Sequence, residues 1–158
     1  MQYIPHVPAE DAVNGSFLAD YWQTPEQDRE HLVLYRTDLS LMLLNRYPYT
    51  NGHLLVAPGE AVADLPQLSI EQRTDLMELT VLGERLLQAA MNPQGINIGI
   101  NLGRCAGAGL PGHLHVHVVP RWGGDVNFMT VVGDVRIVPQ ALEEVYEELL
   151  AVLPKVAG

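Results

Sequence analysis

Three histidines alternate with apolar residues in one stretch of the chain, HLHVHVV at residues 113–119. Strict alternation over this length predicts a β-strand. Because successive side chains of a strand point to opposite faces, His113, His115 and His117 are expected to share one face while the apolar residues between them pack on a core. A glycine-rich stretch, residues 103–112, leads into this row. A glycine loop followed by a row of imidazoles favours a site for an anionic group, above all phosphate.

Imidazole supplies a definite chemistry at such a site. Neutral histidine is nucleophilic near pH 7 and can attack phosphorus, which splits one difficult displacement into two easier ones. Alternate side chains of a strand lie about 6.5–7 Å apart, so the central His115 can reach phosphorus while its two neighbours flank the same phosphate. A purely structural role is the weaker interpretation, because three buried imidazoles would each need hydrogen-bond partners.

The acidic balance of the chain limits the partners that it can bind. Its 158 residues are 47% hydrophobic, which is ordinary for one globular domain with a real core. The formal net charge is −10, which argues against non-specific binding to nucleic acid or to an anionic membrane. A small phosphorylated ligand stays possible, because one site can be locally positive on an acidic protein.

The compartment is predicted from what the sequence contains. Cys105 is the only cysteine, so no disulfide can form within the chain. The N-terminus lacks a basic segment followed by an apolar one, and no apolar run approaches the length of a membrane span. These observations predict a cytoplasmic protein.

Turn residues and hydrophobic periods divide the chain into short strands and two main helices. We expect residues 1–30 to form an irregular arm and residues 31–158 to form a single α+β domain. Its sheet is expected to be antiparallel and five- or six-stranded, with strands at residues 31–36, 40–45, 53–58, 96–101 and 113–119 and an edge segment at 126–132.

The longer of the two helices is predicted at residues 69–91. Ser69 fits its N-cap and Gln72 completes a capping box, while leucines return at helical spacing. A second helix is expected from Pro139, since proline suits the first turn. Its glutamates are most simply a solvated face.

The alternating stretch at residues 96–101 is expected to lie beside the histidine row. Its isoleucines should face the core, whereas Asn97, Gly99 and Asn101 should face the imidazoles if the two strands are neighbours. That arrangement places an amide beside the row and lets the backbone approach closely at Gly99.

The stretch HLHVHVV resembles the signature of the histidine triad (HIT) family, in which histidine and an apolar residue repeat three times before two further apolar residues. Residues 44–49, LNRYPY, and residues 52–58, GHLLVAP, resemble a second landmark of that family. Residues 97–128 are most similar to the branch whose members act on diadenosine polyphosphates. The likeness covers residues 30–130 and extends to the last helix.

The resemblance implies a reaction and assigns the triad. Members cleave the α-phosphate linkage of a dinucleoside polyphosphate through a nucleotidyl-histidine intermediate. His115 corresponds to the nucleophile, His117 to the donor toward a phosphate oxygen, and His113 to the residue that supports the site.

The resemblance also implies which residues bind an adenine nucleotide. It places Asn45 by the ribose, His53 on the wall of the same pocket, and Trp122 at the base or the second nucleotide. Phosphate contacts are expected from one side chain and from loop amides, at Asn101, Gly107, Ala108 and Gly109. Without the family, Asn45 reads equally well as a turn former and Trp122 as a core or interface residue.

Two departures from the family pattern matter. Many members hold a structural zinc, but Ser16, Ala19 and Ala61 stand where three of its ligands are expected, beside the presumed fourth, His113. Neither serine nor alanine holds zinc at neutral pH, so we predict no structural zinc and no other cofactor. Ser16 would then simply cap a short turn. The loop at residues 106–112 offers no side-chain donor, which leaves hydrolysis and phosphorolysis both open.

Several functional alternatives stay open. The substrate can be a nucleoside phosphoramidate instead, or the protein can be a catalytically slow nucleotide-binding regulatory module. A metal enzyme of the cupin kind also uses histidine pairs on a strand, but such sites usually add a nearby carboxylate, and residues 118–120 are apolar here. The family further implies a homodimer.

Overall fold

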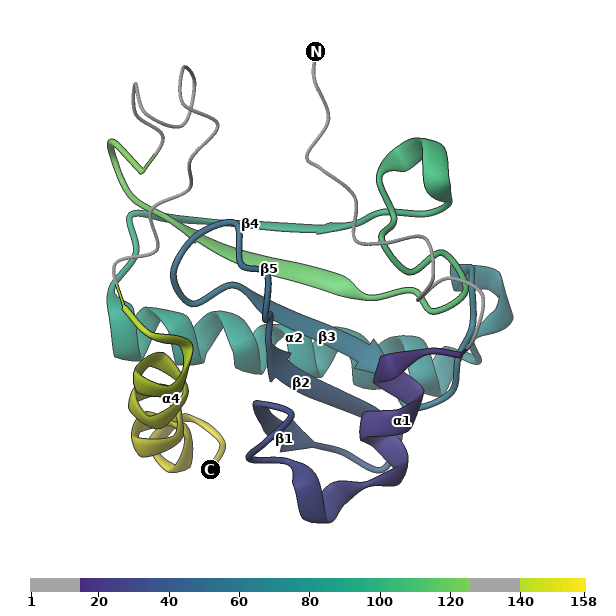
Figure 1. The fold of residues 1–158 in the computed structure, drawn as a ribbon, viewed down its shortest axis with the longest axis horizontal. Coiled ribbons are helices and arrows are strands. Elements are labelled where there is room, and N and C mark those ends of the chain that lie inside the picture. Colours follow the sequence, from purple (N-terminus) through teal and green to yellow (C-terminus); the bar gives the residue numbers. More distant parts are fainter. Residues whose placement is uncertain (1–14, 126–139) are drawn as a thin grey trace.

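One antiparallel sheet organises the part of the chain that this computed structural model describes, residues 15–125 and 140–158 (Figure 1). Its strand order is β1-β2-β3-β5-β4. The strands are β1 (Val33–Arg36), β2 (Ser40–Leu44), β3 (Leu54–Pro58), β4 (Gly95–Ile100) and β5 (Val116–Arg121). The predicted α+β class with five antiparallel strands is confirmed. The sixth segment, expected at 126–132, lies outside the described residues.

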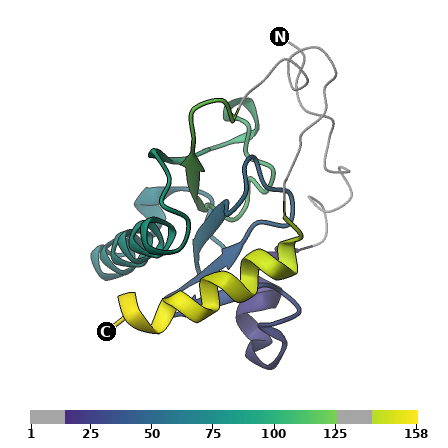
Figure 2. The same cartoon turned by 90° about the vertical axis from the view of Figure 1, so that its left-hand side faces the viewer.

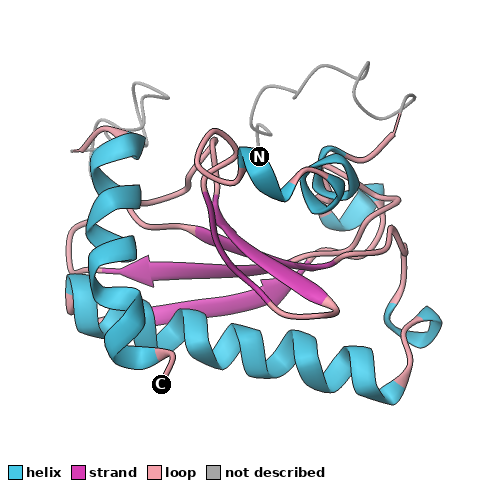
Figure 3. Cartoon of the chain, turned by 90° about the horizontal axis from the view of Figure 1, so that it is seen from below, coloured by secondary structure: helices cyan, strands magenta, loops and turns pink. Residues whose placement is uncertain are grey.

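The two faces of the sheet are covered differently (Figure 3). Helices α2 (Ile70–Met91) and α4 (Leu142–Val156) cover one face, where they bury a large core that includes Val56 and Val116. Helix α1 (Phe17–Gln23) covers part of the other face and buries Leu18 in a smaller cluster. The alternation along β3 divides neighbouring residues between these cores, as a strand buried on both faces requires.

The long helix α2 follows from its caps and its apolar spacing. The Ser69 hydroxyl accepts the N–H of Gln72, and the Gln72 side chain accepts the N–H of Ser69, so the predicted capping box is present. Asn92 ends the helix in the left-handed conformation, at φ 46°. The helix packs on β2 and β3 and against α4 (Figure 2).

The predicted strand at residues 113–119 is shifted in the structure, where β5 begins only at Val116 and runs on to Arg121. Pairing with both neighbours begins only at Val116, opposite Val56 of β3 and opposite Ile100, where β4 ends, although β3 itself continues to Pro58. His113 and His115 therefore lie on an extended approach to the strand. The N–H of Leu114 holds this approach by donating to the carbonyl of Val62 at 2.7 Å.

The N-terminal arm was expected to be irregular, but its described part contains α1 and a short 3₁₀ turn at Pro25–Gln27. Arg36 explains why so short a helix is held. Its guanidinium donates to the carbonyls of Tyr21 and Trp22 at the end of α1 and pairs with the carboxylate of Asp28. Gly59 lets the Trp22 ring pack closely, since a Cβ there would lie 2.3 Å from it.

The last helix, α4, begins at Leu142, and the predicted start at Pro139 lies outside the described residues. The Tyr146 hydroxyl donates to the carbonyl of Val33 at 2.8 Å and ties α4 to β1. Within residues 15–125 and 140–158, no helix has both the length and the apolar content of a membrane span.

Candidate active site

His115 is held in one orientation by the backbone that precedes it. Its Nδ1 lies 2.9 Å from the carbonyl oxygen of His113. A carbonyl only accepts, so Nδ1 carries the proton and Nε2 keeps its lone pair. The side chain is 7% exposed and its ring lies edge-on to that of His117, with 4.9 Å between centroids. This is the protonation pattern that a nucleophilic imidazole needs.

His113 is buried completely and is bonded at both ring nitrogens. Its Nε2 lies 2.7 Å from the carbonyl oxygen of Pro58, so Nε2 carries the proton. Its Nδ1 lies 2.6 Å from the hydroxyl of Ser16, which must then donate. His113 thus faces protein on both sides, and its contribution to the site is the carbonyl that orients His115.

His117 ends a chain of hydrogen bonds that begins in the loop at residues 45–53. The Asn45 side-chain amide and the Tyr49 backbone N–H both lie by Nδ1 of His53, at 3.2 and 3.1 Å. Because these two donors point at Nδ1, that nitrogen accepts and His53 is protonated at Nε2. His53 Nε2 then donates to Nδ1 of His117 over 3.0 Å. The proton of His117 is left on Nε2 as a donor.

Burial keeps the three imidazoles neutral near pH 7. Loss of solvation lowers the pKa of His115, although the bond to the His113 carbonyl opposes this, and it lowers the pKa of His113 in the same way. The pKa of His117 falls from 6.5 to about 4, first through burial and then through repulsion from His115. A neutral His115 is the reactive form.

The aromatic ring of Tyr49 covers this end of the row. It stacks on His117, with centroids 5.7 Å apart and planes 18° apart, and lies 4.6 Å from His53. The Asn45 side-chain oxygen accepts the N–H of Tyr47 and so closes the same loop. Asn45 therefore serves as a turn former here, and its predicted ribose contact stays a prediction.

The register of β4 against β5 places the predicted phosphate-binding residues. Gly99 pairs with His117, so Gly99 and Asn97 share the face of His117, as expected for neighbouring strands. Two isoleucines of β4, Ile96 and Ile100, pack on the core, but Ile98 is 47% exposed because β4 ends the sheet. That part of the prediction is wrong.

The glycine-rich loop is folded on itself. Gly107 and Ala108 donate their N–H groups to the carbonyls of Arg104 and Gly103. The Asn101 side chain donates to the Gly107 carbonyl at 3.4 Å. In this conformation two of the three predicted phosphate donors are used within the loop, and only the Gly109 N–H has no acceptor among the described residues. Asn101 shapes this loop.

Trp122 is not brought to the imidazoles within one chain. It follows the end of β5, seven residues and therefore roughly 23 Å beyond His115. The neighbouring Arg121 is tied to Asp125 and to the side chain of Asn97, so its charge is already engaged. The predicted contact of Trp122 with a base stays a prediction.

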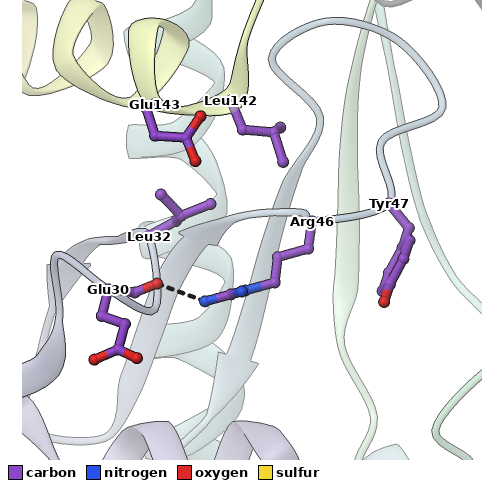
Figure 4. Close-up of a pocket in the computed structure, with 6 residues that line it drawn as sticks. All are labelled: Glu30, Leu32, Arg46, Tyr47, Leu142 and Glu143. Atoms are coloured by element: carbon purple, nitrogen blue, oxygen red, sulfur yellow. Dashed lines mark hydrogen bonds between the residues drawn. The ribbon is translucent and has the colours of Figure 1, made fainter.

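A separate pocket of about 270 Å³ adjoins the start of the same loop (Figure 4). Arg46 crosses it to donate to the carbonyl of Glu30, and Leu32 and Leu142 form its apolar walls. The carboxylate of Glu143 lies on its rim, so the pocket mixes both signs of charge. The carboxylates of Glu30 and Glu143 beside Arg46 disfavour a polyphosphate there.

Sequence reasoning singled out the triad, Asn45 and His53, which the structure places in two hydrogen-bond systems whose rings meet at His115 and His117. It missed the donor from Ser16 and the carbonyl of Pro58, which together fix His113. Ser16 and His113 are 97 residues apart, so no local pattern joins them. The capping serine was the one available signal.

Residues around His113 also decide whether zinc fits. Ser16 offers a hydroxyl that already bonds His113, while Ala19 and Ala61 carry no donor atom. In the part of the chain that the structure describes, no three side chains of the metal-ligating kinds gather into a site. These residues do not fit a structural zinc.

Comparisons with known proteins agree with this geometry. The family model for the HIT domain matches residues 26–124. AP-4-A phosphorylase of Mycobacterium tuberculosis (strain CDC 1551 / Oshkosh) is 40% identical over 147 residues, or 91% of this chain and 75% of that protein. The asymmetrical bis(5'-nucleosyl)-tetraphosphatase of Schizosaccharomyces pombe is 38% identical over 56% of this chain and 48% of its own length. The crystal structure of a Zn-bound histidine triad family protein from Mycobacterium smegmatis has a TM-score of 0.66 and 30% identity, covering 90% of this chain and 98% of that one.

Proposed function

Because the chain belongs to the HIT domain family, with a match over residues 26–124, we propose that it cleaves a dinucleoside polyphosphate of the diadenosine tetraphosphate type at an α-phosphate. The single observation that carries this proposal is the state of His115. Its Nδ1–H is engaged by the His113 carbonyl, its Nε2 is free to attack, and burial keeps it neutral. The name and extent of the 40% identical relative support the substrate class.

In the first step, the Nε2 lone pair of His115 forms a bond to the α-phosphorus while the bond from phosphorus to the bridging oxygen breaks. The departing nucleoside polyphosphate leaves with the electron pair. The imidazole gains positive charge, which the His113 carbonyl stabilises through Nδ1–H. The Nε2–H of His117 is the donor toward an oxygen of the same phosphate, because His53 holds its other nitrogen.

In the second step, an acceptor oxygen attacks the same phosphorus and the bond to Nε2 breaks, so the lone pair returns to His115. We propose inorganic phosphate as the acceptor, which releases a nucleoside diphosphate. The relative that covers 91% of this chain is named a phosphorylase, whereas the tetraphosphatase covers only 56% of it. Water in place of phosphate would release a nucleoside monophosphate.

The test is a product analysis with diadenosine tetraphosphate, with and without inorganic phosphate. We expect ADP and ATP, formed only when phosphate is present, and a loss of about 10⁴-fold or more in His115→Ala, as for other nucleophiles. His31→Gln is the matched control, since His31 stacks on Tyr21 outside the site. AMP and ATP without phosphate would contradict phosphorolysis. An inactive wild type would contradict the substrate and favour a phosphoramidate or a regulatory role.

We also propose that the chain folds without structural zinc. The residues at the expected ligand positions support this, because Ser16 bonds His113 through a hydroxyl and Ala19 and Ala61 carry no donor atom. Metal analysis of the purified protein should find well under one zinc per chain, and a chelator should leave the thermal midpoint unchanged. One zinc per chain, or a midpoint that falls with chelator, would contradict the proposal.

A homodimer is the assembly that we propose. Among the described strands, β4 pairs on one side only, and it exposes Ile98 near the exposed Leu102. Pairing of two β4 edges would cover both. Sedimentation should give a dimer for the wild type and a monomer for Ile98→Lys, while Met77→Lys, at a similarly exposed position of α2, should stay dimeric. A monomeric wild type would contradict this assembly.

The exposed single thiol of Cys105 is consistent with a cytoplasmic location, which we propose on that basis.

A further inference from the structure

Ser16 lies at the meeting point of α1 and the active-site backbone. Its hydroxyl oxygen accepts the N–H of Ala19 at 3.3 Å and so caps α1. The same oxygen lies 2.6 Å from Nδ1 of His113, which is completely buried. One hydroxyl therefore uses its lone pair for the helix and has its proton available for the imidazole.

The direction of the bond follows from the other side of the ring. The carbonyl of Pro58 can only accept, so Nε2 of His113 is the protonated nitrogen and Nδ1 is the acceptor. Among the described residues, the hydroxyl of Ser16 is the only donor that bonds Nδ1. Without it, a buried nitrogen lone pair would lack a partner, which is costly in a protein interior.

The His113 side chain also anchors the backbone carbonyl that orients His115. The N–H of His113 donates to Leu110, and its carbonyl accepts Nδ1–H of His115 at 2.9 Å. The approach at residues 113–115 has no strand neighbour, because pairing of β5 begins at Val116. Besides the backbone N–H groups of His113 and Leu114, which bond Leu110 and Val62, the buried His113 side chain is the anchor that fixes the position of that carbonyl.

We propose that Ser16 is a positioning residue for His115, acting through His113: its hydroxyl holds the Nε2–H form of His113 in place and thereby aims the carbonyl that orients the nucleophile. In its kinetic readout this inference rests on the proposed function. Its spectroscopic readout does not, because the protonated nitrogens of the imidazoles can be measured without substrate.

Ser69 provides a matched control within the same chain. Its hydroxyl caps α2 by accepting the N–H of Gln72 at 3.1 Å, as Ser16 caps α1, but it makes no bond to an active-site residue. Ser16→Ala and Ser69→Ala each remove one helix cap, and each should lower the thermal midpoint by a few degrees. Only Ser16→Ala also removes a donor to the active site.

The experiment measures imidazole nitrogen NMR and steady-state kinetics on the full chain. In the wild type, we expect the proton on Nε2 of His113 and on Nδ1 of His115. In Ser16→Ala, we expect the His113 and His115 signals to shift and kcat to fall about tenfold with little change in KM, since misplaced groups lose rate first. Ser16→Thr, which keeps the hydroxyl, should restore both, and Ser69→Ala should change neither.

Ser16→Asp keeps a good cap, so it folds even if Ser16→Ala does not. Its carboxylate cannot donate, so His113 should take up a second proton at a pH where the wild type is neutral. The inference is overturned if wild-type His113 carries its proton on Nδ1, or if Ser16→Ala lowers only the midpoint, as Ser69→Ala does. A wild type without turnover would end the proposed function alone, and the imidazole signals would still decide the inference.

Discussion

His113 and His117 stand two residues to either side of His115, but the protein surrounds them differently. His113 is completely buried and bonds a hydroxyl and a carbonyl of the protein at its two nitrogens. His117 is partly exposed and bonds the protein through one nitrogen, Nδ1, which accepts from His53. A row that looks symmetric in sequence thus has a buried anchor on one side and, on the other, an imidazole with one nitrogen left for the donor role that we propose.

Replacement of His117 should give the largest effect of this comparison. His117→Ala removes the Nε2–H donor, so we expect kcat for diadenosine tetraphosphate to fall about 10³-fold, within the range for a positioned proton donor. The free energy of unfolding should change much less, since the side chain is partly exposed. Kinetics and urea unfolding of the same preparation measure both. A fall of less than tenfold in kcat would place the donor elsewhere.

Replacement of His113 should reverse that pattern. His113→Ala leaves a cavity and unpairs the Ser16 hydroxyl and the Pro58 carbonyl, so we expect the free energy of unfolding to fall by about 3 kcal/mol. The loss in kcat should stay smaller than that of His117→Ala, because His113 reaches the substrate only through His115. Equal losses of stability in the two variants would remove the distinction between anchor and donor.

Local features of the chain are predicted from the sequence better than features that join distant segments. The capping box of Ser69 and Gln72 is local, and α2 begins where predicted. The alternation at residues 113–119 predicts the triad, but the strand begins at Val116 because its pairing with β3 and β4 begins there, and that pairing depends on other parts of the chain. The bond from Ser16 to His113 joins residues 97 apart and needs the folded α1.

The burial of a strand residue also depends on where its strand lies in the sheet, which the local sequence does not determine. The alternation predicts that all three isoleucines of β4 face the core. Ile96 and Ile100 do pack on it. Ile98 is exposed since β4 lies at the end of the strand order, which the local pattern does not contain. The strand order comes from the folded structure, as do the tautomers of His53 and His117, which follow from distances between atoms.

The pH dependence of stability should show an effect of intermediate size, which arises mainly from His117. The pKa of His117 is about 4 in the fold and 6.5 in the unfolded chain, so between these values only the unfolded chain binds the proton. Stability is therefore full above about pH 6.5 and falls as the pH is lowered toward 4, by up to about 3 kcal/mol from this group.

Urea unfolding from pH 4 to 7 measures this loss. His117→Gln should flatten the profile, because glutamine can still accept from His53 but does not titrate. The burial of His113 and His115 lowers their pKa in the same direction, so some dependence should remain in the variant. Coincident profiles of wild type and variant would contradict the assignment to His117.

The smallest effect is expected from removal of the Tyr49 ring, which covers only the His117 side of the row. Tyr49→Ala removes a ring stacked on His117 and close to His53 but keeps the backbone N–H that bonds His53, so the tautomer chain survives. Aromatic pairs contribute about 0.5–1.5 kcal/mol, so kcat should fall only about three- to tenfold. Tyr47→Ala, at a 74% exposed position of the same loop, is the matched control and should leave kcat unchanged. If Tyr49→Ala lost as much as His117→Ala, the loop rather than the imidazole would be what places the donor.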